Sequence, residues 1–134
     1  MFDELLKYKK NGHFIFTKGD NLVKVGKEVP NLPGVYYIIR LAKRNVDLVY
    51  IGKSGIKTPL GKNKDSLLKQ SINVQQGLLD IKLSESNIEG LDIYWFVTMD
   101  PDHIDLPVYV LGLIMQTYYD AYGRLPEWNT GGVE

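Results

Sequence analysis

Two tyrosines in short glycine-containing tripeptides are the first candidates for chemistry in this chain. They stand in Gly34-Val35-Tyr36 and in Tyr50-Ile51-Gly52. A free phenol has a pKa of about 10, so it needs a nearby cation before it can exchange a proton usefully near neutral pH. Cationic side chains also attract backbone phosphates. The cations expected around the face that carries the two tripeptides are Lys43, Arg44, Lys53, Lys57, Lys62, Lys64 and Lys69.

A β-hairpin is predicted to carry both tripeptides. Residues 35–41 and 47–51 are rich in β-branched and aromatic side chains, and the polar residues 43–45 between them suit a turn. Because strands favour tyrosine for packing alone, an ordinary structural role is the alternative interpretation of both tyrosines.

The register of this hairpin decides whether the two phenols meet. If the turn is centred on Lys43, antiparallel pairing sets Tyr36 opposite Tyr50. The same register sets Gly34 opposite Gly52, and both phenols then share one face of the sheet. A turn shifted by one residue would change every pair.

Two helices and one strand are expected after the hairpin. A helix is predicted over residues 65–74, following a loop rich in lysine and glycine, and a strand over residues 91–98. A last helix is predicted over residues 107–122. Pro107 suits its first turn, and Gly123 ends it.

The N-terminal segment is expected to add a short helix and a β extension. Residues 2–9 have apolar side chains at helical spacing. Residues 13–17 and 22–25 have the composition of short strands, separated by turn-forming residues, and are predicted to form a small hairpin or an added edge.

Length and element order predict a single α+β domain with a small antiparallel β-sheet flanked by helices. A chain of 134 residues suits one hydrophobic core. Residues 30–129 are expected to form the domain and residues 1–29 an N-terminal extension packed on it. Residues 130–134 are expected to form a flexible tail.

Composition excludes several classes of protein and site. The chain has no cysteine, which excludes disulfides and thiolate metal sites, and its two histidines do not by themselves predict a zinc centre. The longest apolar stretch, residues 108–115, is far shorter than the ~20 residues that span a bilayer. Acids at positions 3 and 4 stand where a signal peptide needs a basic region. We expect no membrane partner and a cytoplasmic location.

Charge is distributed unevenly along the chain. Residues 1–69 contain 14 Lys and Arg against 6 Asp and Glu, which gives +8, whereas residues 70–134 contain 2 against 10, which gives −8. A basic face that attracts nucleic acid is one consequence. The alternative is that the two halves intermix in space and their charges cancel.

The two tripeptides, the hairpin between them and the closing segment together resemble the GIY-YIG nuclease superfamily. The first tripeptide starts one strand and the second ends the next, and Gly123-Arg124-Leu125-Pro126-Glu127-Trp128-Asn129 is similar to the closing segment of the family, which has a characteristic asparagine. The resemblance covers about residues 30–129. It implies the α+β fold already predicted, and a nucleic-acid partner, DNA rather than RNA.

The resemblance also implies roles for particular residues. In the family, a phenol near the first motif helps to activate water, while the second-motif tyrosine and a helix arginine organise the scissile phosphate. By resemblance, Tyr36 and Tyr50 take the tyrosine positions and Asn129 the asparagine position. Lys69 is the cation nearest the arginine position, and it lacks the planar guanidinium that grips two phosphate oxygens. The substrate-binding candidates are Lys43, Arg44, Lys53 and Lys64, and Gly34 and Gly52 complete the motif.

One acidic residue that the resemblance implies is missing. Family members bind a divalent cation through a glutamate on a later helix, but residues 108–116 contain no acid here, and Leu111 or Gly112 takes its place. Magnesium sites usually take one or two carboxylates besides substrate oxygens. Asp105 precedes this helix, and Asp120 lies about 12 Å beyond Gly112 along the helix axis. No cofactor is evident, and magnesium or manganese is expected only if the protein is active.

Three functions follow from these observations. The first is a GIY-YIG-like nucleic-acid-binding domain with lost or much reduced phosphodiester hydrolysis. The second is an active metal-dependent endonuclease that recruits its acid from Glu85, Glu127 or a partner chain. The third is a non-enzymatic protein-interaction domain, because a fold does not fix a function. The sequence predicts neither the sequence preference nor the oligomeric state.

Overall fold

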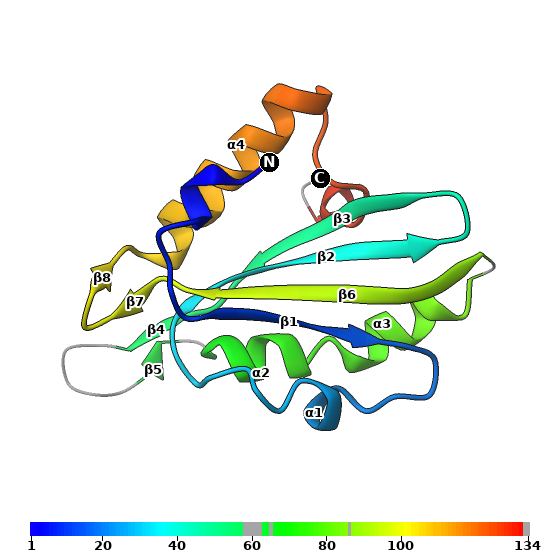
Figure 1. Ribbon diagram of the computed structural model, residues 1–134, viewed down its shortest axis with the longest axis horizontal. Coiled ribbons are helices and arrows are strands. Elements are labelled where there is room, and N and C mark those ends of the chain that lie inside the picture. Colours follow the sequence, from blue (N-terminus) through cyan, green and yellow to red (C-terminus); the bar gives the residue numbers. More distant parts are fainter. Residues whose placement is uncertain (58–62, 65, 86, 133–134) are drawn as a thin grey trace.

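Four antiparallel strands form the central sheet, in the order β1-β6-β2-β3 (Figure 1). They are β1 (Asn11–Phe16), β2 (Gly34–Ala42), β3 (Val46–Lys53) and β6 (Ile88–Val97). Two small ladders pair β4 (Ile56–Lys57) with β5 (Asn63–Lys64) and β7 (Met99–Asp100) with β8 (His103–Ile104). This computed structural model describes residues 1–57, 63–64, 66–85 and 87–132, with the backbone alone at residues 57, 63–64 and 130–132.

Helices cover both faces of the sheet, which gives the α+β architecture predicted from the sequence. One face packs under α1 (Leu22–Val25), α2 (Leu68–Asn73) and α3 (Gln76–Leu83), around core residues that include Tyr36, Leu68 and Trp95. The other face packs under α4 (Pro107–Tyr122) and the short helix η1 (Asp3–Leu5), around a second core that includes Val35, Ile51 and Ile114. The helix η2 (Glu127–Gly132) contacts β3, one of the two edge strands.

The hairpin of β2 and β3 has a different register from the predicted one. Its turn has two central residues, because Ala42 and Asn45 exchange backbone hydrogen bonds of 2.9 and 3.3 Å. This moves every pair by one residue. A β-bulge on β3 then adds a second one-residue shift, between the pairs Ile38 with Tyr50 and Ile39 with Leu48.

Together the two shifts leave both tyrosines on the same face of the sheet, as predicted, but change which residues of β2 and β3 are paired. The prediction that Tyr36 is opposite Tyr50 is wrong, because Tyr36 pairs with Gly52 and Tyr50 pairs with Ile38. Since each one-residue shift exchanges the two faces, two shifts restore the original face. Both phenols therefore do share one face, as predicted, and they are diagonal neighbours.

The N-terminal predictions are partly wrong. Strand β1 exists and pairs with β6 as an added edge of the sheet, which is one of the two predicted arrangements, rather than forming a hairpin with residues 22–25. Those residues form α1, because Asn21 caps the turn: its side-chain oxygen accepts a 3.3 Å hydrogen bond from the backbone N–H of Lys24. The helix predicted over residues 2–9 is a single turn, η1, since the chain must straighten for Lys10 to accept from the backbone N–H of Val97.

The later elements agree better with the sequence predictions. Helix α4 has the predicted bounds, with Pro107 in its first turn and Gly123 at φ 69° as its left-handed cap. Strand β6 begins three residues before the predicted strand. The helix predicted over residues 65–74 is shorter, and α3 follows it without having been predicted. Residues 130–132 of the expected tail continue η2, and residues 133–134 lie outside the described part of the chain.

Candidate functional site

Tyr36 and Tyr50 lie together at the end of the sheet where β2 begins and β3 ends. Their ring centroids are 6.0 Å apart with the planes tilted by 42°. Tyr36 is 2% exposed, and the side-chain amide of Gln75 donates a 3.2 Å hydrogen bond to its phenol oxygen. The structure thus brings the two predicted tyrosines together with a residue from the segment between α2 and α3.

The two motif glycines make room for this arrangement. A Cβ atom at Gly52 would lie 2.5 Å from Cζ of Tyr36 and 2.7 Å from its phenol oxygen. A Cβ atom at Gly34 would overlap the carbonyl oxygen of Phe96 and lie 2.7 Å from Cδ1 of Leu68. Gly52 of the second motif therefore leaves the space that the ring of Tyr36 in the first motif occupies.

Ser54 and Asn129 fix the backbone around the tyrosines. The hydroxyl oxygen of Ser54, which is buried, accepts from the N–H of Gly34 at 2.8 Å, while the N–H of Ser54 donates to the carbonyl of Gly34 at 2.9 Å. The Asn129 side chain accepts from the N–H of Ile51 at 2.9 Å and donates to its carbonyl at 3.0 Å. Asn129 thus pairs with backbone hydrogen-bonding groups at the outer edge of β3, as a neighbouring strand would.

An open recess of about 320 Å³ adjoins the two phenols. Among its described lining residues, Lys53 is the one cation, and there is no carboxylate. The lining residues are Tyr36, Tyr50, Lys53, Ser54, Gly55, Ser66, Ser71, Val74 and Gln75. This set of neutral donors and one cation suits an anion better than a metal ion.

The environment of Tyr36 keeps its phenol protonated. Burial raises the pKa of Tyr36 well above its usual value, and the nearby Tyr50 raises it further, while the hydrogen bond from Gln75 opposes this shift. Desolvation disfavours the phenolate because charge is poorly stabilised away from water. At neutral pH Tyr36 can therefore donate a hydrogen bond, and it is a poor general base.

Most of the predicted cations whose side chains the structure describes lie away from the phenols. Lys69 lines a neighbouring recess of about 680 Å³, where its ammonium group donates to the backbone carbonyl of Lys27 at 3.2 Å. That recess shares Ser66 with the tyrosine recess. Of the predicted substrate-binding residues, Lys53 lines the tyrosine recess itself.

Lys43 and Arg44 lie at the other end of the hairpin. They line a recess with Ala42 and Asn45, and the β2–β3 turn is at the opposite end of the sheet from β4 (Figure 1). Seven residues of strand separate Tyr36 from Lys43, which is roughly 23 Å at 3.3 Å per residue. The side chains of Lys57, Lys62 and Lys64 lie outside the described part of the structure.

The acids considered as replacements for the missing glutamate are held elsewhere. Asp105 accepts from the Tyr8 phenol at 2.7 Å and lies 3.1 Å from the ammonium group of Lys7. The remaining three contact other partners: Glu127 pairs with Arg40, Glu85 with Lys82, and Asp120 accepts from Gln116.

Helix α4 lies across the sheet from the phenols. Leu111 packs in the core on the α4 face, and Gly112 is exposed, whereas Tyr36 belongs to the core on the opposite face. No group of three or more His, Asp or Glu side chains that could hold a metal ion occurs among the described residues. The described residues at the phenols therefore do not fit the divalent cation that the family resemblance implies.

Comparison with families of known proteins, with curated proteins and with solved structures finds no match for this chain. No helix in the described part of the chain is long and apolar enough to cross a membrane.

Sequence reasoning missed two residues of the site. Gln75 contacts Tyr36 from the break between α2 and α3 at residues 74–75. The helix predicted from the sequence ends at residue 74, so the sequence assigns no position to Gln75. Ser54 could have been found, since a serine directly after a predicted strand often bonds to nearby backbone.

Proposed function

We propose that this chain is a nucleic-acid-binding domain that holds backbone phosphate at the tyrosine recess without hydrolysing it. The observation that supports this proposal is the recess itself, in which two phenols, Gln75 and Lys53 meet without a carboxylate among the described lining residues. DNA is the ligand to test first.

Phosphate binding would use the donors that remain free. Gln75 donates to the Tyr36 oxygen, so the Tyr36 proton is available to Tyr50 or to a ligand. In either case one phenol proton is left for a phosphate oxygen. Lys53 is exposed at the rim of the recess and supplies the charge that phosphate requires.

A second phosphate has a place next to the first. The larger recess shares Ser66 with the tyrosine recess, and its charged lining residues are Lys27, Lys69 and the acid Glu28. A backbone could therefore run from Lys53, past the phenols, to Lys69. On this path Lys69 would contact a phosphate next to the one at the phenols.

Hydrolysis lacks two requirements at this site. Water activation needs a base, but the pKa of Tyr36 is raised by burial. Charge on the phosphate is normally neutralised by a divalent cation, and the described residues at the phenols offer it no carboxylate.

The test is binding of a fluorescent DNA oligonucleotide, measured by anisotropy over a range of salt concentrations. Each phosphate contact contributes about 0.7 to 0.9 to the slope of log affinity against log salt, so Lys53→Gln should lower that slope by about this amount. Lys18→Gln, in the turn after β1, is the matched control and should leave the slope unchanged. Equal affinity of the wild type and Lys53→Gln would contradict the proposal.

The same preparations test the endonuclease alternative. We expect no nicking of supercoiled plasmid in magnesium or manganese. Nicking by the wild type that disappears in Tyr36→Phe would establish an active enzyme and overturn the proposed loss of hydrolysis.

A further inference from the structure

The outward side of α4 is almost free of charge. Asp120 is the one charged residue among the sixteen of this helix. Val108, Tyr109 and Tyr119 are 58%, 57% and 50% exposed. Surface helices normally cover their outer side with charged and polar residues. An exposed apolar patch of this kind marks an interaction surface.

Gly112 lies in the middle of this surface and has no packing role among the described residues. A Cβ atom there would meet no described atom within 4 Å, whereas one at Gly52 would overlap a ring. Glycine inside a helix lowers helix stability relative to alanine, so a purely internal account leaves Gly112 unexplained. A missing side chain does allow another backbone to approach closely.

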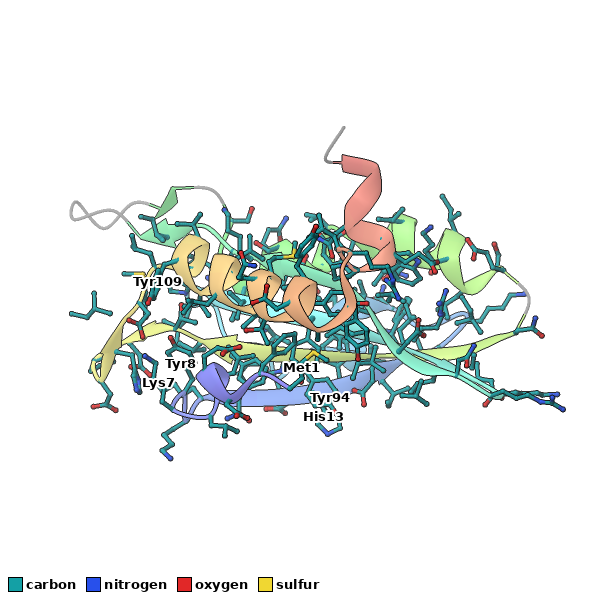
Figure 2. All side chains as sticks on the ribbon, turned by 90° about the horizontal axis from the view of Figure 1, so that it is seen from above. Met1, Lys7, Tyr8, His13, Tyr94 and Tyr109 are labelled. Atoms are coloured by element: carbon teal, nitrogen blue, oxygen red, sulfur yellow. The ribbon has the colours of Figure 1, made fainter. Side chains whose placement is uncertain are left out.

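The surface contains both a projection and a hollow. A recess of about 320 Å³ is lined by Gly112, Met115, Gln116, Tyr119 and Leu125. Tyr109 stands one turn before Gly112 on the same side of the helix, and its side chain is exposed. In Figure 2, Tyr109 lies near the N-terminal end of α4, at the same end of the molecule as Lys7 and Tyr8.

We propose that this surface binds a second copy of the chain, with two α4 helices packed antiparallel around Gly112. A two-fold interface requires one surface to complement itself. Tyr109 of each copy then fills the recess at Gly112 of the other. The shallow crossing angle of antiparallel bundle helices keeps the two helices in contact over several turns.

Charge complementarity also favours a second copy. Asp120 lies eight residues beyond Gly112, or about 12 Å at 1.5 Å per residue. In the antiparallel pair it reaches the N-terminal end of the other α4. That end has no acid in its first turn and no side-chain cap, and the exposed ammonium group of Lys7, which pairs with Asp105 just before the helix, adds a cation that a carboxylate can approach. A nucleic acid is a poor occupant, because α4 has no cation.

Sedimentation equilibrium of the whole chain, from micromolar to millimolar concentration, tests the proposal. We expect a concentration-dependent rise toward twice the 15.3 kDa mass of one chain. Tyr109→Ser removes the projection and should weaken self-association on the order of 30-fold, as loss of a central aromatic anchor does. Val23→Ser, another exposed apolar side chain, on α1, should change nothing.

Gly112→Gln separates the interface from the fold. Its side chain enters empty space in the monomer and improves helix propensity, so the thermal midpoint at high dilution should rise while self-association weakens. A monomer at all concentrations would overturn the proposal, as would a dimer that Tyr109→Ser and Gly112→Gln leave unchanged. Neither result bears on DNA binding at the tyrosine recess.

Discussion

Replacing Gly52 by alanine tests whether glycine is required at this position to make room for the ring of Tyr36. The new Cβ would lie 2.5 Å from Cζ of Tyr36, about 1 Å inside ordinary van der Waals contact, and the ring is buried and cannot swing into solvent. Overpacking of a core costs about 1–3 kcal/mol, while alanine in a strand recovers roughly 0.5–1 kcal/mol relative to glycine. We expect a net loss of about 1–2 kcal/mol in the free energy of unfolding, measured by urea denaturation.

A double-mutant cycle identifies the ring as the cause. Tyr36→Leu removes Cζ, Cε1 and the phenol oxygen, the three atoms that the new Cβ would meet, so Gly52→Ala should become neutral or slightly stabilising in that background. Gly77→Ala is the matched control. A Cβ at Gly77 in α3 meets no described atom within 4 Å, and this change should stabilise by about 1 kcal/mol. The same loss from Gly52→Ala in both backgrounds would refute the reasoning.

Three further outcomes follow from the structure. Asn129→Ala should lower the free energy of unfolding by about 1–2 kcal/mol in urea denaturation, because both bonds to the Ile51 backbone are lost, and Asn129→Asp should not restore it, since a carboxylate cannot donate to the carbonyl. Burial, helped by Tyr94 and Asp92, raises the pKa of Tyr37 to about 12. The neutral phenol therefore stabilises the fold fully below pH ~10, and this stabilisation is lost as the pH rises to 12. Tyr37→Phe should therefore remove part of the alkaline loss in stability measured by circular dichroism. Leu111→Glu and Gly112→Glu should produce no magnesium-dependent plasmid nicking, because α4 lies across the sheet from the phenols, and nicking by either variant would contradict that placement.

The sequence predicted the parts of the fold that depend on local patterns. Helix α4 follows from Pro107, its apolar periodicity and Gly123, and all three signals are local. Strand β6 follows from a run of β-branched and aromatic residues that places Ile93, Trp95 and Val97 on one face. Residues 22–25 were assigned to a strand because β-branched residues favour strands, but the Asn21 cap outweighs that preference over a single turn.

The candidate site was predictable in its residue types but not in its contacts. The tyrosines were placed on one face through a register that proved wrong, since neither the two-residue turn nor the bulge on β3 has a distinct local signal. Positions such as Lys69 and Gln75 depend on the rotation of α2 and on the break after it. Helix rotation is set by packing of Leu68 and Ile72 against the sheet, and tertiary contacts of this kind cannot be assigned from spacing alone.

Chemical-shift mapping by two-dimensional NMR tests the central claim most directly. A short DNA oligonucleotide is titrated into the isotope-labelled chain in the presence and absence of magnesium. The proposal predicts amide shifts concentrated at residues 53–55, Ser66 and Gln75, with intact DNA at the end of the titration. Shifts confined to other surfaces, or no shifts at low salt, would contradict binding at the tyrosine recess.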